Sequence, residues 1–75
     1  MPVTLYTTAG CHLCEQAHSW LLTVDPKLEI RLLDVAEDDA LIDAYGERIP
    51  VIRCRGRELA WPFGLLEVRA LLLEG

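Results

Sequence analysis

The sequence predicts an α/β fold in which a four-stranded mixed sheet carries three helices, in the order βαβ, then α, then ββα. Three observations support this prediction. Apolar strand-like and helix-like segments alternate along the 75 residues. Cys11 and Cys14 stand where the first strand meets the first helix. Arg55-Gly56-Arg57 is typical of a hairpin between the last two strands. At this length we expect a single domain, residues 1–75, with a small core.

The first half of the chain is predicted to form a strand, a helix and a second strand. Residues 3–7 are apolar on both faces, as in a central strand. An apolar stripe at helical spacing predicts a helix over residues 12–24, which ends before Pro26. The stripe comprises Leu13, Ala17, Trp20, Leu21 and Val24, while Glu15, Gln16, His18 and Ser19 are expected to face water. A strand over residues 29–35 follows. The helix between the two strands forms a right-handed crossover, which makes the second strand parallel to the first.

The second half is predicted to form a helix, a hairpin and a last helix. The helix covers about residues 38–45, with Leu41, Ile42 and Tyr45 inward and Gly46 as its C-cap. Residues 51–55 and 58–61 form the hairpin strands, and residues 65–73 form the last helix. We expect the sheet order 2-1-3-4, with the first and third helices on one face and the second helix on the other.

Composition and charge exclude several classes of function. The net charge is −5, and no basic cluster with interleaved aromatic residues is present, so we expect neither a nucleic acid nor an anionic membrane as partner. No secretory leader follows Met1, and no apolar run approaches the ~20 residues of a membrane span. We therefore expect a cytoplasmic monomer, in which a Cys-x-x-Cys pair is more often catalytic or metal-binding than structural.

The two cysteines predict a redox centre. A helix that begins near Cys11 places this sulfur at its N-terminus, where free N–H groups and the helix dipole favour a thiolate. Cys14 lies one turn further on nearly the same face, close enough to form a disulfide with Cys11. Pro50 precedes a strand that should neighbour the first strand, so it is expected beside Cys11, where it lines a substrate groove.

With these motifs the chain resembles the glutaredoxin-like branch of the thioredoxin fold, and most closely the small bacterial glutaredoxin-like proteins with a Cys-His-Leu-Cys centre. The resemblance covers essentially the whole chain, and its carriers are Leu5-Tyr6, Gly10-Cys11-His12-Leu13-Cys14, Tyr45-Gly46-Glu47-Arg48-Ile49-Pro50-Val51 and Trp61-Pro62-Phe63. It implies a thiol–disulfide oxidoreductase with Cys11 as the attacking thiol and Cys14 as the resolving thiol. It also implies that Pro50 is the cis-proline of the fold and that the Ile49 backbone pairs with substrate.

The resemblance implies substrates and partners as well. The substrate is a disulfide-containing protein or a glutathione mixed disulfide, and a reductase or the glutathione system donates electrons; no cofactor is required. Typical members carry a lysine before the first cysteine and a Gly-Gly-acidic segment before the last helix. Here these places read Thr7-Thr8-Ala9-Gly10 and Trp61-Pro62-Phe63-Gly64. We therefore expect weaker recognition of glutathione and a groove suited to extended peptides.

Several residues keep two interpretations. His12 either raises the positive potential at Cys11 or is a solvated residue of the first turn. Arg48 either attracts a substrate carboxylate or the Cys11 thiolate, or is a surface charge. Trp61 and Phe63 are expected to fill the edge of the core, and the alternative is that they line a peptide groove. Cys54 is expected to be a buried, apolar-like cysteine.

Two alternative functions remain for the chain as a whole. One is a metal or iron–sulfur module through Cys11 and Cys14, for which a site that includes His18 is geometrically conceivable. The other is a partner-binding domain with an inert Cys-x-x-Cys pair.

Overall fold

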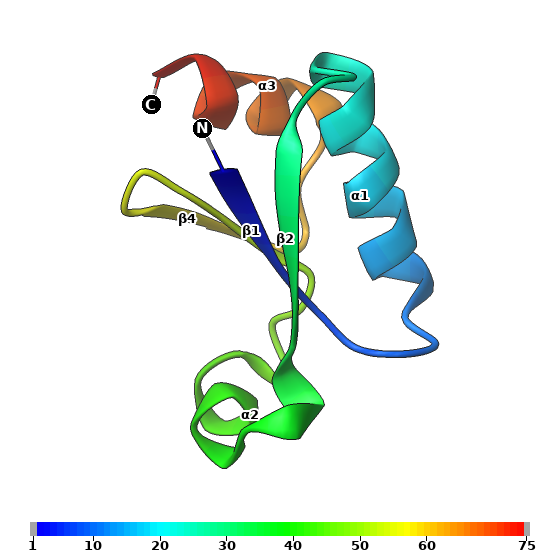
Figure 1. The fold of residues 1–75 in the computed structure, drawn as a ribbon, viewed down its shortest axis with the longest axis vertical. Coiled ribbons are helices and arrows are strands. Elements are labelled where there is room, and N and C mark those ends of the chain that lie inside the picture. The colour runs from blue at the N-terminus through cyan, green and yellow to red at the C-terminus, as the bar shows by residue number, and fades with distance from the viewer. Residues whose placement is uncertain (1, 75) are drawn as a thin grey trace.

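The computed structural model describes residues 2–74, so Met1 and Gly75 of the expected 1–75 domain lie outside the described residues. Figure 1 shows the elements along the chain. They are β1 (Pro2–Thr7), α1 (His12–Val24), β2 (Glu29–Asp34), η1 (Val35–Glu37), α2 (Asp39–Tyr45), β3 (Val51–Cys54), β4 (Arg57–Ala60) and α3 (Leu65–Glu74). The predicted elements are all found. One difference is that β2 ends one residue early, because the Asp34 carboxylate accepts from the Ala36 N–H and starts the short 3₁₀ helix η1.

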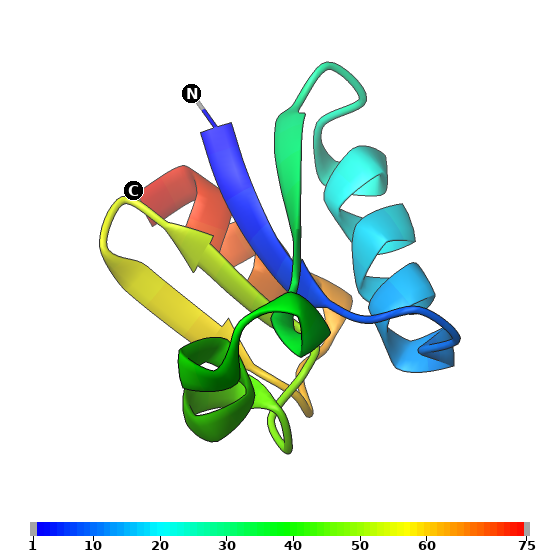
Figure 2. The ribbon, with the colours of Figure 1, turned by 60° about the horizontal axis from the view of Figure 1, so that its bottom comes forward.

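The four strands form one mixed sheet in the predicted order β2-β1-β3-β4. β1 is parallel to β2 and antiparallel to β3, and β3 is antiparallel to β4. Arg55 and Gly56 both have positive φ, 52° and 79°, which suits the tight hairpin between β3 and β4. Tyr6, near the end of β1, lies opposite Val51, the first residue of β3. The Cys11 loop and the Pro50 loop therefore leave the sheet at the same end (Figure 2).

Helices α1 and α3 cover one face of the sheet, as predicted, and the main core lies between them and the strands. The buried members of this core are Val3, Leu5, Ala17, Leu21, Ile52, Cys54, Phe63, Val68 and Leu71. Cys54 is only 1% exposed, so the expectation of a buried, apolar-like cysteine is correct. Trp20, Trp61 and Phe63 close one edge of the core, with ring centroids 5.1–6.1 Å apart. This agrees with the edge-filling role expected for Trp61 and Phe63.

Helix α2 packs on the opposite face at one end of the sheet, at the bottom of Figure 1. The second core combines buried Tyr6, Val35 and Val51 with half-buried Leu41, Tyr45, Ile49 and Ala60. Ile42 is exposed, so its predicted inward position is wrong. A helix this short buries a single stripe, here Leu41 and Tyr45 at i and i+4, and Ile42 lies about 100° away from Leu41 around the axis. Gly46 is the C-cap as predicted, but in a right-handed conformation, with φ −52°.

The inward face of α1 is rotated from the predicted stripe. Its buried residues are Cys14, Ala17 and Leu21, at i, i+3 and i+7. Leu13, placed in the stripe by the sequence, is exposed instead, because it precedes Cys14 by one helical step. The second cysteine, not Leu13, therefore begins the apolar face of this helix.

Candidate functional site

Cys11 is the N-cap of α1. Its backbone is extended, with φ −90° and ψ 103°, and its carbonyl accepts the first helical hydrogen bond, from the Glu15 N–H at 3.2 Å. Its Sγ accepts a hydrogen bond from the Cys14 N–H at 3.1 Å. Gly10, with φ +76°, gives the chain the left-handed turn that leads into this cap. A sulfur that accepts from an N–H at a helix N-terminus is stabilised as a thiolate when the disulfide is reduced.

Cys11 and Cys14 form a disulfide, with Cα atoms 5.2 Å apart. The two sulfurs differ in environment. Cys11 is partly exposed, whereas Cys14 is 3% exposed and belongs to the buried face of α1. A disulfide partner from solution can therefore approach Cys11, and Cys14 is held behind it. This is the arrangement that an attacking thiol and a resolving thiol require.

His12 lies on the solvent side of the first turn of α1. Its Nδ1 is 3.7 Å from the Glu15 carboxylate, and the two side chains are 97% and 79% exposed. This position favours the solvated interpretation of His12. The Glu15 carboxylate in the first turn complements the helix dipole, and the same negative charge opposes a thiolate at Cys11.

The Pro50 loop is held to its surroundings by backbone hydrogen bonds. The Tyr45 carbonyl accepts from the Arg48 N–H at 2.8 Å and from the Ile49 N–H at 3.1 Å, and the Trp61 N–H donates to the Pro50 carbonyl at 3.1 Å. The Ile49–Pro50 bond is cis, the isomer that the resemblance implies, and Pro50 is fully buried. Because the Ile49 N–H is already donated to Tyr45, substrate pairing through that group requires this internal bond to break.

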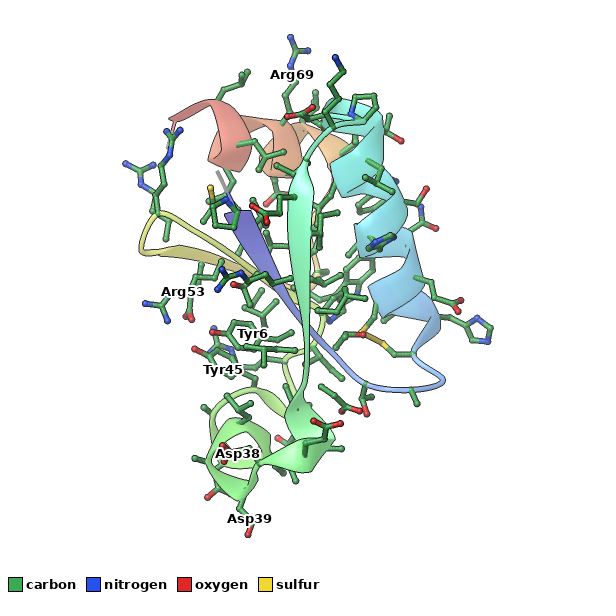
Figure 3. The ribbon with its side chains drawn as sticks, viewed as in Figure 1. Tyr6, Asp38, Asp39, Tyr45, Arg53 and Arg69 are labelled. Atoms are coloured by element: carbon green, nitrogen blue, oxygen red, sulfur yellow. A yellow bond between two sulfur atoms is a disulfide. The ribbon has the colours of Figure 1, made fainter. Side chains whose placement is uncertain are left out.

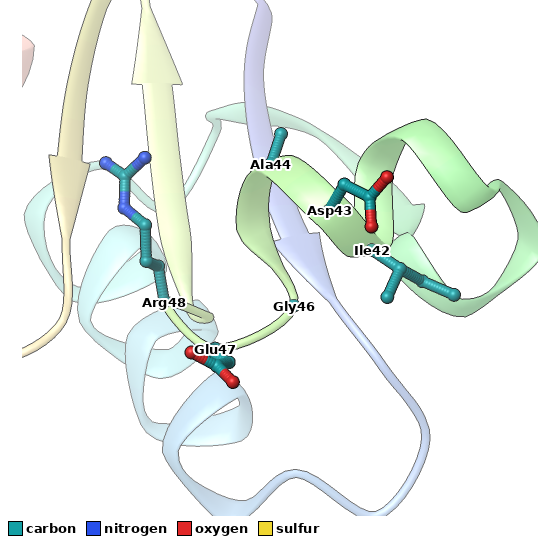
Figure 4. A pocket seen from close by; sticks show the side chains of 6 residues that line it. All are labelled: Ile42, Asp43, Ala44, Gly46, Glu47 and Arg48. Atoms are coloured by element: carbon teal, nitrogen blue, oxygen red, sulfur yellow. The ribbon is translucent and has the colours of Figure 1, made fainter.

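Arg48 lies with its guanidinium over the Tyr45 ring, 5.7 Å from the ring centroid. It also lines a pocket of about 500 Å³ at the C-terminal end of α2. In Figure 4 its side chain extends away from Glu47 toward the hairpin strands. The lining residues are Ile42, Asp43, Ala44, Gly46, Glu47 and Arg48. This contact with Tyr45 accounts for the position of Arg48 as a surface charge packed on an aromatic ring.

The sequence did not predict a pair of stacked tyrosines near the end of β1. The rings of Tyr6 and Tyr45 are stacked, with centroids 4.2 Å apart (Figure 3). The Tyr45 hydroxyl donates to the Glu58 carboxylate at 2.5 Å. That hydrogen bond, followed by one with Tyr6, raises the pKa of Tyr45 to about 12. A hydrogen bond with Tyr6 likewise raises the pKa of Arg53. The pair fastens α2, and with it the Pro50 loop, to β1 and β4.

His18 is half-buried, so it faces water only in part. It lines a pocket of about 240 Å³ beside Cys14, together with Leu5, Thr7, Cys14, Glu15 and Leu32. The sequence could have indicated that His18 lies near Cys14, because residues four positions apart lie on the same side of a helix.

Among residues 2–74, no group of three or more His, Cys, Asp or Glu side chains is placed to hold a metal ion. In that same part of the chain no helix is long and apolar enough to cross a membrane.

Fold and site together define a small thioredoxin-fold protein with a Cys-x-x-Cys disulfide at the start of its first helix. A profile of the glutaredoxin-like domain (DUF836) matches residues 2–73, and the chain belongs to this family.

Two structures of the structural-genomics target protein XcR50 from X. campestris are similar to it. The X-ray structure is 40% identical, with a TM-score of 0.84 over 97% of each chain. The solution structure is 41% identical, with a TM-score of 0.84 over 100% of this chain and 96% of XcR50. Thioredoxin 1 from Thermosipho africanus TCF52B is 16% identical, with a TM-score of 0.70 over 99% of this chain and 92% of the thioredoxin, and shares the fold. No protein with a curated description matches the chain.

Proposed function

We propose that this protein is a thiol–disulfide oxidoreductase whose working group is the Cys11/Cys14 pair. The observation that carries the proposal is the asymmetry of the disulfide, which joins a partly exposed Cys11 at a helix N-terminus to a buried Cys14. A structural disulfide has no need of an exposed sulfur placed where a thiolate is stabilised. Family membership and the thioredoxin fold are consistent with a redox function.

The reaction runs in two exchange steps. The Cys11 thiolate attacks one sulfur of a substrate disulfide, forms a mixed disulfide and releases the first substrate thiolate. Cys14 then attacks Cys11, which releases the second substrate thiolate and leaves the Cys11–Cys14 disulfide. A donor dithiol, or two glutathione molecules, reverses the same steps and restores both thiols. The chemistry requires no cofactor beyond these two cysteines.

The substrate we propose is an exposed disulfide of a protein, bound as an extended peptide beside the Pro50 loop. Two positive charges could hold a carboxylate of glutathione. Arg48 instead packs on the Tyr45 ring, and the lysine that typical members carry before the first cysteine is absent here. Glutathione mixed disulfides are proposed as substrates of lower efficiency. A reducing compartment such as the cytoplasm suits this chemistry, because the pair must be reduced again after each turnover.

A redox titration of the pair tests the proposal. The native protein is equilibrated in glutathione and in thioredoxin buffers, and the oxidised fraction of Cys11 and Cys14 gives their reduction potential. The reduced protein is then mixed with a peptide disulfide. We expect exchange much faster than for the matched Cys11→Ser variant, which keeps Cys14 and Cys54. Equal rates for the native protein and this variant would contradict the proposal.

A further inference from the structure

The pocket beside Cys14 is lined by the resolving cysteine and by a histidine. Cys14 and His18 stand four residues apart on α1 and line the same pocket of about 240 Å³. Residues at this spacing lie one above the other on a helix face. The volume holds several water molecules at about 30 Å³ each, so a direct or water-mediated path between sulfur and imidazole has room. His18 is half-buried, which leaves part of its ring in contact with solvent.

Cys14 needs a proton acceptor of this kind. Its sulfur must lose a proton to attack Cys11, yet Cys14 is only 3% exposed. A thiolate formed there has lost most of its hydration, which raises the free energy of the charged form. Cys11 has the N–H of Cys14 and the helix N-terminus to stabilise its charge. Cys14 lies inside the helix, where its own N–H is directed to Cys11.

The charged groups around the pocket single out the histidine. Glu15 also lines the pocket, but its carboxylate is 79% exposed and lies 3.7 Å from His12. Asp34, two residues beyond Leu32 on β2, has its carboxylate occupied by the Ala36 N–H at 2.9 Å. The remaining lining residues, Leu5, Thr7 and Leu32, are uncharged. At neutral pH an imidazole is also better matched than a carboxylate to accept a proton from a thiol.

We infer that His18 is the general base for the resolving step, a role that rests on the proposed oxidoreductase function. His18 takes the Cys14 thiol proton, directly or through one water, as the Cys14–Cys11 bond forms and the bond from Cys11 to the substrate sulfur breaks. The two cysteines are oxidised, and the substrate sulfur leaves as a thiolate. The imidazolium then releases its proton to solvent. In the reverse direction the imidazolium protonates Cys14 as it leaves.

Stopped-flow kinetics with dithiobisnitrobenzoate, an aromatic disulfide with a coloured thiolate product, separates the two steps. With equimolar reagent, attack by Cys11 releases the first coloured thiolate, and attack by Cys14 on the mixed disulfide releases the second in a unimolecular phase. We expect His18→Gln to slow the second phase about tenfold or more at pH 7. The pH profile of the native second phase should change in the His18→Gln variant.

The matched control is Gln16→Ala, an exposed residue of the same helix that does not line the pocket, and it should leave the second phase within about twofold of native. As a test beyond structure, imidazole added to a His18→Ala variant should accelerate its second phase, because the pocket has room for the free base. Circular dichroism verifies that each variant is folded. Identical second-phase pH profiles for the native protein and His18→Gln would overturn the inference, as would a profile that changes in Glu15→Gln and not in His18→Gln. A first phase no faster than that of a free thiol would instead contradict the proposed function, so the two failures are distinguishable.

Discussion

The Tyr45 hydroxyl donates a 2.5 Å hydrogen bond to the Glu58 carboxylate and thereby ties helix α2 to strand β4. The same residue supports the Pro50 loop from the other side, since its carbonyl accepts from the N–H groups of Arg48 and Ile49. Its ring stacks on Tyr6 of β1. One tyrosine thus connects the Pro50 loop to two strands of the sheet.

The Tyr45–Glu58 bond predicts a loss of stability at alkaline pH. The hydrogen bond raises the pKa of Tyr45 from 10.0 to about 12, because the bond holds the phenol proton. The stabilisation is therefore complete below pH 10 and is lost as the pH rises from 10 toward 12. We expect Tyr45→Phe to unfold at lower urea concentration than the native protein at pH 7, with a difference of about 1 kcal/mol in free energy of unfolding. That difference should shrink above pH 10.

Glu58→Gln is the matched control for this effect. It keeps an acceptor for the phenol but removes the charge, so the residual bond should be weaker and the alkaline loss smaller. If the native protein and Tyr45→Phe kept the same difference in stability from pH 7 to pH 11, the bond would not contribute to folding as described.

The three cysteines should react in a fixed order. Cys11 is partly exposed at a helix N-terminus, whereas Cys14 and Cys54 are 3% and 1% exposed. After reduction, iodoacetamide at pH 6 should label Cys11 at least about ten times faster than either of the others. Peptide mapping by mass spectrometry gives the order, and Cys11→Ser is the control for background labelling. Faster labelling of Cys14 would reverse the roles assigned to the pair.

Gly10 and Gly56 separate two effects of replacing a glycine. One is the loss of stability caused by the left-handed backbone, and the other is an effect on disulfide exchange at Cys11. Both have positive φ, +76° and +79°, and an added Cβ at either would meet nothing within 4 Å. We expect Gly10→Ala and Gly56→Ala each to lose about 1 kcal/mol of stability through the left-handed conformation alone. Only Gly10→Ala, in the loop before Cys11, should also slow disulfide exchange. Equal exchange rates for the two variants would show that the loop shape does not matter to the thiol.

Most of the fold could be predicted from the sequence because its signals are local. The crossover rule made β1 and β2 parallel, the Arg55-Gly56 turn made β3 and β4 antiparallel, and both pairings are observed. The errors lie at Leu13 and Ile42, where the outcome depended on how each helix is rotated against the sheet. A hydrophobic pattern fixes that rotation only to within about one residue, or 100°.

In the candidate site, too, some features could be predicted from the sequence and others could not. The cysteine spacing was sufficient to place Cys11 at a helix N-terminus and Cys14 behind it. The Tyr45–Glu58 bond joins residues 13 positions apart, and nothing in the spacing of a tyrosine and a glutamate in different elements signals such a contact. The hydrogen bond from the Ile49 N–H to the Tyr45 carbonyl could not be predicted either, because it depends on the conformation of the loop after α2.

The substrate class can be decided by trapping. A Cys14→Ser variant cannot resolve the mixed disulfide, so substrates should remain bound to Cys11. Because the Gly-Gly-acidic segment is replaced by Trp61-Pro62-Phe63-Gly64 and Arg48 lies on Tyr45, we expect most of the trapped material to be protein and a minor part glutathione. Non-reducing electrophoresis followed by mass spectrometry measures both fractions.

The matched control for the trap is the double variant Cys11→Ser, Cys14→Ser, which keeps Cys54 and should retain nothing, because Cys54 is 1% exposed. Protein adducts that need Cys11 would support an extended-peptide groove beside Ile49 and Pro50. Adducts with glutathione alone, together with rapid removal of glutathione from mixed disulfides by the native protein, would contradict it. In that outcome the backbone around Pro50 would bind the tripeptide without the missing side chains, and the internal bond from the Ile49 N–H to Tyr45 would have to open for it.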